Sequence, residues 1–306
     1  MLIPHFSVRC ASILGPERAG PRLTRPPVLA RLLVGVALLV GLVLASSETA
    51  SAAPLPLAAT AVPAPPKADQ LERHLTSYLT ARKVTASVRV RDLLTGETYS
   101  YRAGSRYDSA SVVKVAIMAA VLRRQEAQKR YLTSREVRLL RAMIQNSDND
   151  AASSLYASLG RGPALTKFYQ AAGMTHTTPG PGRYWGLTQI TAADQVVLLN
   201  HLARPSKLLN ERGRSYARKL MASVQASQSW GVSAGPRADG ARVELKNGWL
   251  SRNAHGWRVH SIGHVSGDGR DYLVAVLTMD NTTRNGGIAV VEGVSKIVWR
   301  DLAPAG

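Results

Sequence analysis

The spacing of apolar residues near the start of the folded part predicts a helix followed by a β-hairpin. Within residues 69–83, apolar residues recur every three or four positions, as one face of a helix requires. They are Leu71, Leu75, Tyr78 and Leu79. Residues 85–104 then alternate between apolar and polar positions on both sides of a Thr95-Gly96 turn, which is typical of two paired strands.

The rest of the chain divides into a helical middle and a C-terminal part rich in strands. Helical spacing predicts segments near residues 134–145, 149–159, 163–172, 191–203 and 210–225. Alternation predicts strands in residues 242–250, 256–266 and 270–279, followed by a helix in residues 286–302. Strands at both ends of an uninterrupted helical middle predict an α+β fold, with one sheet built from both termini and an inserted helical subdomain.

The first 68 residues are not expected to belong to this fold. Residues 32–45 form an apolar stretch behind Arg31, and an A-x-A site follows at residues 50–52. This pattern predicts a secretory signal peptide over residues 1–52, hence a secreted protein; a retained membrane anchor is the alternative. Residues 53–68 are rich in Pro and Ala and predict an extended linker, which leaves residues 69–306 for the domain.

Cysteine content and charge restrict the chemistry and the partners. Cys10 is the only cysteine and lies in the predicted signal, so we expect no disulfide, no thiol catalysis and no lipid attachment at the cleavage site. Residues 1–52 hold five Arg and two Glu, so the remainder carries +16 of the total charge of +19. This charge favours association with anionic cell-wall polymers, or is simply a solvated surface. Nucleic acid is not expected, because the basic residues are scattered and aromatics are few.

A lysine within an apolar run is the first sign of catalytic chemistry. Residues 112–122 are apolar except for Lys114, and we expect a helix to begin at about Ser111. Ser111 and Lys114 then share one face of the first turn. A desolvated lysine loses its charge more readily, and a neutral amine can accept a hydroxyl proton. The alternative is that Ser109 or Ser111 caps the helix while Lys114 reaches solvent.

Two further triplets stand downstream in a meaningful order. Ser147-Asp148-Asn149 falls in the helical middle, and Lys246-Asn247-Gly248 falls on a predicted strand. Each alone is typical of a helix cap or a turn. Together with Ser111-x-x-Lys114 they resemble the S-x-x-K, S-D-N and K-T-G motifs of the class A β-lactamase-like, penicillin-recognising serine hydrolases. The resemblance covers residues 69–302 and implies a β-lactamase/transpeptidase-like fold, no cofactor, and a β-lactam or cell-wall peptide as substrate.

The resemblance assigns a role to each matching residue. Ser111 is the expected nucleophile, Lys114 accepts its proton, and Ser147 relays a proton to the leaving nitrogen. Lys246 is expected to polarise the Ser147 hydroxyl and attract a substrate carboxylate. The remaining expectations are that Asn149 binds a substrate carbonyl or orients Lys114, that Asn247 donates to a carboxylate, that Gly248 permits close backbone approach, and that the Trp249 N–H joins the Ser111 N–H around the oxyanion.

The sequence departs from that family at three points. Class A enzymes carry a glutamate after S-D-N that activates the deacylating water, but no Asp or Glu stands between Asp150 and Asp194. The loop expected there, residues 173–186, is rich in Gly, Pro, Thr and aromatics. Asn247 replaces a hydroxyl residue, and the 36 residues from Ser111 to Ser147 make a short insert. We therefore expect slow hydrolysis of the acyl-enzyme.

Other residues fit structural roles better than catalytic ones. His260 and His264 share a strand face, but no third metal ligand is evident, so we expect packing and no metal. Asp194 follows Thr191 at capping-box spacing and predicts a helix start. Residues 227–235 are expected to border the cleft. Three functions stay open: a serine hydrolase acting on β-lactams, a D-alanyl-D-alanine peptidase, and a non-catalytic binding protein of the envelope, in each case as a monomer.

Overall fold

The structure is a computed structural model that describes residues 67–236 and 240–304. The chain divides into two compact units, residues 1–60 and 61–306, and every described residue belongs to the second unit. The expected signal peptide and most of the expected linker therefore lie outside the described residues. None of the helices in the described ranges is long and apolar enough to cross a membrane.

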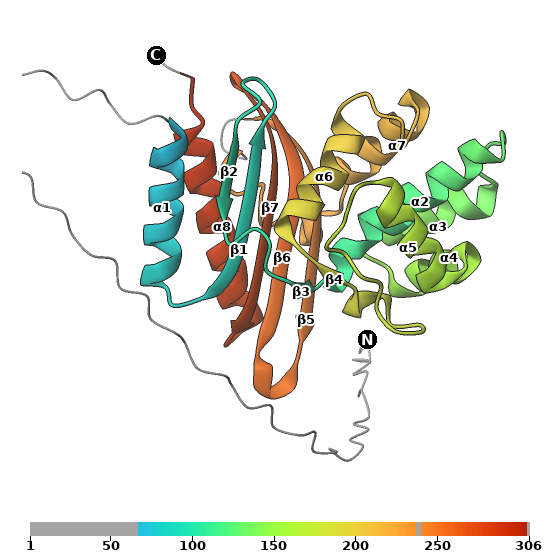
Figure 1. Cartoon of the computed structure of the whole chain (residues 1–306), viewed down its shortest axis with the longest axis horizontal. Helices are drawn as coiled ribbons and strands as arrows, with labels where there is room; N and C mark the ends of the chain where they lie inside the picture. Colours follow the sequence, from blue (N-terminus) through green and yellow to red (C-terminus); the bar gives the residue numbers. More distant parts are fainter. Residues whose placement is uncertain (1–66, 237–239, 305–306) are drawn as a thin grey trace, which may run out of the picture. The chain divides into compact units, whose positions relative to one another are not determined.

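A five-stranded antiparallel sheet forms the centre of this unit, with helices on both faces (Figure 1). The strands, in spatial order, are β2 (Thr98–Tyr101), β1 (Thr85–Asp92), β7 (Arg270–Asn281), β6 (Trp257–Gly267) and β5 (Arg242–Ser251). Val88 of β1 pairs with both Tyr101 of β2 and Val276 of β7, so the N-terminal hairpin adds directly to the C-terminal strands. One sheet is thus assembled from both ends of the chain, and the fold is α+β as predicted.

The two faces of the sheet are covered by helices from different parts of the chain. α1 (Lys67–Ala81) and α8 (Arg284–Asp301) cover one face (Figure 1). The helical middle covers the other face with α2 (Lys114–Ala127), α3 (Ser134–Gln145), α4 (Asn149–Leu159), α5 (Arg161–Ala171), α6 (Ala192–Ala203) and α7 (Glu211–Met221). Each face has its own buried apolar cluster, because alternate residues of a strand point to opposite sides.

The expectation of an uninterrupted helical middle is wrong. β4 (Gln189–Ile190) lies inside it and pairs antiparallel with β3 (Tyr107–Asp108), which directly precedes the predicted nucleophile. Ser109 N–H also donates to Thr188 O at 2.8 Å. Two-residue strands are too short to show periodicity, so no alternation of residues predicts this link. Its consequence is that the loop before β4 is tied to the serine turn.

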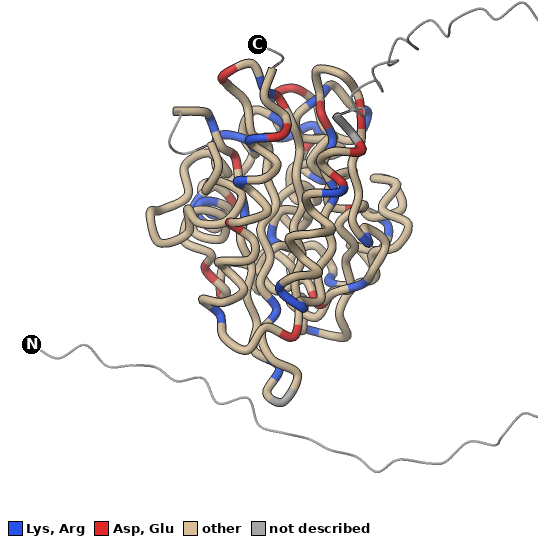
Figure 2. Tube along the Cα trace, turned by 90° about the vertical axis from the view of Figure 1, so that its left-hand side faces the viewer, with Lys and Arg blue, Asp and Glu red and all other residues tan. Residues whose placement is uncertain are grey.

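Positive charge is spread over the described part of the chain. Figure 2 shows Lys and Arg distributed over the described part of the trace, with Asp and Glu interspersed among them. Many of the arginines pair with carboxylates, as Arg124 and Arg130 do with Glu136 at the start of α3. There Thr133 and Glu136 form a reciprocal capping box.

Candidate active site

The predicted nucleophile stands in a tight turn that leads into α2. Residues Ala110–Val113 form a 3₁₀ turn, η1, and the α-helix begins at Lys114. The helical start predicted at Ser111 is therefore present, but its first turn is 3₁₀. Neither Ser109 nor Ser111 caps it: Ser109 makes no side-chain cap bond, and Val113 occupies the cap position of α2. Ser109 is fully buried and donates to Gly186 O at 3.3 Å, so Ser111 is the serine of this turn that is not fully buried.

Lys114 is fully buried, and its amine contacts neutral oxygens. Lys114 Nζ donates to Ser147 O at 2.6 Å, to Ser147 Oγ at 3.2 Å and to Asn149 Oδ1 at 2.8 Å. The alternative that Lys114 reaches solvent is therefore wrong. Burial lowers the pKa of Lys114 to about 7, although the charge of Asp148 acts in the opposite direction. A large share of this lysine is accordingly neutral near pH 7, as a proton acceptor must be.

Ser147 lies between two lysines. Its hydroxyl is 3.2 Å from Lys114 Nζ and 3.0 Å from Lys246 Nζ. Ser147 adopts a left-handed backbone with φ 57°, and Ala110, next to the nucleophile, does the same with φ 46°. Such conformations are unfavourable for residues other than glycine and cluster at functional sites. The strained residue between α3 and α4 directs its hydroxyl to both amines, an arrangement suited to proton transfer.

Lys246 reaches the same hydroxyl from the opposite side, on β5. It is fully buried and also donates to Asn247 O at 2.9 Å. Burial brings the pKa of Lys246 well below its ordinary value, and the neighbouring charge of Lys114 lowers it further. Among the described residues, no carboxylate lies within ion-pair distance of either amine.

Gly248 brings strand β5 against the serine turn. A Cβ built on Gly248 would stand 2.8 Å from Ser111 N and 2.9 Å from Val112 N. Only glycine permits this approach, since contacts that close force the backbone to move. The prediction that Gly248 allows close backbone approach agrees with this geometry, which places the Ser111 N–H beside the strand that carries Lys246.

Asn247 does not face the cleft, contrary to the expectation that its amide donates to a substrate carboxylate. Its side chain is fully buried, and Nδ2 donates to Gln228 O at 2.8 Å and Trp230 O at 2.9 Å. Because alternate strand residues point to opposite faces, Asn247 points away from the side of Lys246. Both amide protons are used to hold residues 228–230, so Asn247 acts here as a support for that loop.

Trp249 follows the triplet, and its indole packs against Trp230 and Arg284. Its ring centroid lies 6.0 Å from that of Trp230, and the Arg284 guanidinium stands 4.3 Å from the Trp249 ring centroid. These side-chain contacts hold the C-terminal part of β5, including the backbone of Trp249, in place. Its expected oxyanion role concerns the backbone N–H and stays a prediction.

The loop after Ser147-Asp148-Asn149 brings an aromatic residue to the site, where the resemblance would have placed a carboxylate. Trp185 lies with its ring centroid 5.0 Å from Lys114 Nζ, and its Nε1–H donates to Ser153 Oγ at 3.1 Å. The sequence motifs do not include Trp185. The aromatic content of this acid-free loop is the sequence signal that points to it.

The two histidines and Asp194 have structural partners. Neutral His260, whose pKa burial lowers to about 4, bridges Asp108 O and Thr278 N. His264 lies between Glu244 and Asp271. In the described part of the chain, no group of three or more His, Cys, Asp and Glu is placed to hold a metal. Asp194 lies in the first turn of α6, where its N–H donates to the side chain of the cap residue Thr191, in agreement with the predicted helix start.

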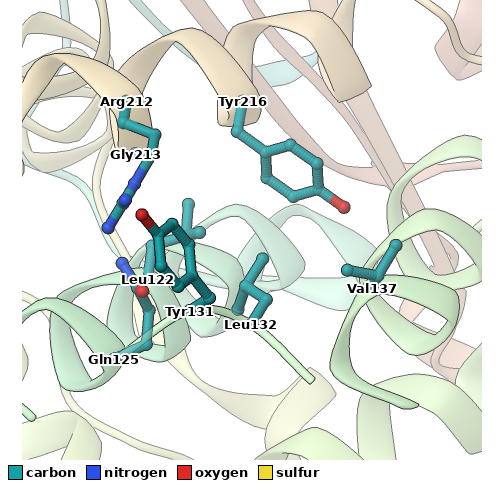
Figure 3. A pocket seen from close by; sticks show the side chains of 8 residues that line it. All are labelled: Leu122, Gln125, Tyr131, Leu132, Val137, Arg212, Gly213 and Tyr216. Carbon is teal, nitrogen blue, oxygen red and sulfur yellow. The ribbon is translucent and has the colours of Figure 1, made fainter. Parts of the chain in front are cut away.

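A pocket of about 250 Å³ lies away from this site, between α2, α3 and α7. Figure 3 shows the side chains that line it, which are Leu122, Gln125, Tyr131, Leu132, Val137, Arg212, Gly213 and Tyr216. None of these residues belongs to the three motifs. Helix α2 thus presents Lys114 at its first residue and an apolar wall near its other end.

Comparison with known proteins agrees with the fold and with the family that the sequence resembles. The model of the beta-lactamase enzyme family matches residues 70–138 and 132–302, and the chain belongs to this family. Among solved structures, a class A beta-lactamase from Mycobacterium abscessus has a TM-score of 0.66 at 22% identity, over 75% of this chain and 98% of that one. The TLA-3 extended-spectrum beta-lactamase has a TM-score of 0.68 at 15% identity, over 78% and 100%. At these identities the likeness shows the fold alone.

Two curated relatives match smaller parts of the chain. The chain is 27% identical over 212 residues to the protein named "Putative lipoprotein LppW" of Mycobacterium tuberculosis, which covers 67% of this chain and 66% of that protein. It is 31% identical over 160 residues to a protein named "Beta-lactamase" of Streptomyces lavendulae, over 43% and 52%. The chain thus spans about two thirds or less of the length of these relatives.

Proposed function

We propose that the protein is an exported serine hydrolase that forms an acyl-enzyme at Ser111 with β-lactams or related amides bearing a carboxylate. The observation that carries the proposal is the Ser147 hydroxyl, which lies within 3.2 Å of two buried amines, neither of them ion-paired with a carboxylate of the described residues. Such buried amines destabilise a fold, so their retention is better explained by chemistry than by packing. The family membership and the name of the Streptomyces relative support the same reaction class.

The proposed acylation follows from the arrangement of these groups. Ser111 Oγ attacks the substrate carbonyl carbon while its proton passes to the neutral Lys114 amine. The oxyanion is met by backbone N–H groups, the first from Ser111. When the C–N bond breaks, the leaving nitrogen takes a proton from Ser147 Oγ, which the Lys114 ammonium replaces. Lys246 orients the hydroxyl and attracts the substrate carboxylate.

The proposed fate of the acyl-enzyme is slow hydrolysis. Water needs a base when it attacks the acyl carbon, and residues 151–193 contain no Asp or Glu. Acylation can then outrun deacylation, with each tenfold in rate corresponding to about 1.4 kcal/mol of barrier. A D-alanyl-D-alanine peptidase acting on cell-wall peptides uses the same first step and is the second candidate. A lipoprotein name among the relatives favours an envelope setting for either.

Intact-mass measurement tests the proposal directly. A fluorescent penicillin should add one adduct, mapped to Ser111 by peptide mass, and a chromogenic cephalosporin should give a burst of one equivalent before a very slow steady state. Ser111→Ala should abolish the adduct, while Ser105→Ala, at an exposed serine six residues earlier, should retain it. No adduct on the parent protein, or one that survives Ser111→Ala, contradicts the proposal.

A further inference from the structure

We propose that Trp185 is a positioning residue that shields Lys114 from water and so prolongs the acyl-enzyme. This inference rests on the proposed function and extends it from the formation of the adduct to its lifetime. It starts from the contact between the indole and the buried amine, whose ring centroid and Nζ are 5.0 Å apart.

The indole is held in place from two sides. Its Nε1–H donates to Ser153 Oγ on α4 at 3.1 Å, which fixes the ring. Its backbone is held by the serine turn, where Ser109 Oγ lies 3.5 Å from Trp185 O and 3.3 Å from Gly186 O. The turn that presents the nucleophile and the helix that follows Ser147 therefore fix the same residue, so the ring position is set by the site itself.

The other sides of Lys114 are already occupied. Three contacts of Lys114 Nζ go to two oxygens of Ser147 and one of Asn149, which lie in the turn before α4 and at its first residue. The indole covers a further approach to the amine. Because an indole has one N–H donor and no acceptor, Trp185 is unable to take a proton from water.

This arrangement acts on the second half of the reaction. In hydrolysis, a water oxygen bonds to the acyl carbon, its proton passes to a base, and the Ser111 oxygen leaves and regains a proton. In the proposed site Lys114, three residues after Ser111, is the candidate base. Acylation needs no water beside Lys114, because Ser111 itself supplies the proton. Hydrolysis does need a water molecule beside Lys114, so an apolar cover slows deacylation more than acylation.

Three variants compare the lifetime of the penicillin adduct by intact mass. Trp185→Ala should shorten the lifetime about tenfold or more, since one order of magnitude needs only about 1.4 kcal/mol. Trp185→Phe should keep it within about threefold, because a ring remains. Tyr184→Ala removes the neighbouring aromatic, which is 54% exposed, and should leave it unchanged. A Trp185→Ala protein that acylates but keeps the parent lifetime overturns the proposal.

A second measurement does not depend on acylation. Competitive labelling with acetic anhydride across pH, read on the Lys114 peptide, reports the titration of this amine. Lys114 is faced by the charges of Asp148 and of Lys246, and both stay in place in the Trp185 variants. Water admitted by Trp185→Ala should raise the titration midpoint by about one pH unit. An unchanged midpoint contradicts the shielding role, whereas absence of any adduct on the parent contradicts only the proposed function.

Discussion

Strand β5 carries two buried ionisable side chains two residues apart, Glu244 and Lys246, and their surroundings are opposite in kind. Glu244 is surrounded by nitrogen atoms of basic side chains: Arg218 Nε at 3.0 Å, Arg242 Nε at 2.9 Å and His264 Nδ1 at 3.2 Å from its carboxylate oxygens. Lys246, equally buried, contacts Ser147 Oγ and a backbone carbonyl oxygen.

The difference separates a stabilising cluster from a reactive one. Burial alone would raise the pKa of Glu244, but hydrogen bonds from His264 and Arg218 overcome it and lower the pKa to about 2. For Lys246 no such hydrogen bonds oppose burial, so its pKa is lowered and the neutral amine is favoured. The Glu244 carboxylate and its partners fix β5 against α7 and β6. The Lys246 amine, which has no such partners, can exchange protons with Ser147.

The largest expected effect is on stability, from Glu244→Gln. This change leaves Arg218, Arg242 and His264 without their common anion, and we expect the free energy of unfolding to fall by about 3 kcal/mol in urea titrations. Because the pKa of Glu244 is lowered on folding, its stabilisation is present at neutral pH and is lost as pH falls from about 4 toward 2. Glu211→Gln, at an exposed residue paired with Arg214, should cost less than about 1 kcal/mol.

If Glu244→Gln instead left stability unchanged but slowed acylation of the folded protein, the two clusters on β5 would not be separate in function.

The next largest effect is on acylation, from Lys114→Ala. Loss of the proton acceptor should slow adduct formation on the order of 10² at neutral pH. The free energy of unfolding should fall less than for Glu244→Gln, because Lys114 is ion-paired with no carboxylate of the described residues. Lys167→Ala, at an exposed lysine of α5, is the matched control and should acylate normally. Acylation within threefold of the parent would show that Lys114 is not the base.

Lys246→Ala should have a smaller and more selective effect. A hydrogen bond from the Lys246 amine to the charged substrate carboxylate contributes about 1.5 kcal/mol or more, so a carboxylate-bearing β-lactam should react roughly tenfold more slowly with Lys246→Ala. An ester without a carboxylate should be affected less. The comparison is made by the ratio of acylation rates for the two substrates. Equal losses for both would mean that Lys246 serves only Ser147 and not substrate capture.

Much of this architecture could be predicted because it follows from periodicity. The segments predicted at 134–145 and 149–159 coincide with α3 and α4, and the Thr95-Gly96 turn joins β1 to β2. Long helices and strands repeat their pattern of buried residues several times, so they can be predicted from the sequence. β3 and β4 have two residues each and repeat nothing, so the link from the loop to the serine turn was missed.

The motifs predict which residues belong together but not how they are arranged. Motif order groups Ser111, Lys114, Ser147 and Lys246, and both lysine amines lie within 3.2 Å of Ser147 Oγ. The catalytic role of each residue stays a prediction. The direction of Asn247 depends on acceptors at 228 and 230, and the position of Trp185 depends on a partner at Ser153. Such contacts join distant parts of the chain and leave no local pattern.

The smallest effect, and the finest test of the comparison, is the pH dependence of acylation. With the pKa of Lys114 at about 7, the neutral fraction rises from about 10% at pH 6 to about 90% at pH 8, so the rate should rise about tenfold and then level off. The midpoint belongs to the pair of lysines that share Ser147.

Asp148 raises the Lys114 pKa and caps α4 through Ala151 N–H. Asp148→Asn keeps a capping side chain but removes the charge, so the midpoint of stopped-flow acylation rates should move to lower pH by a few tenths of a unit. A flat profile between pH 6 and 8, or a midpoint that moves upward, would mean that burial does not control this amine.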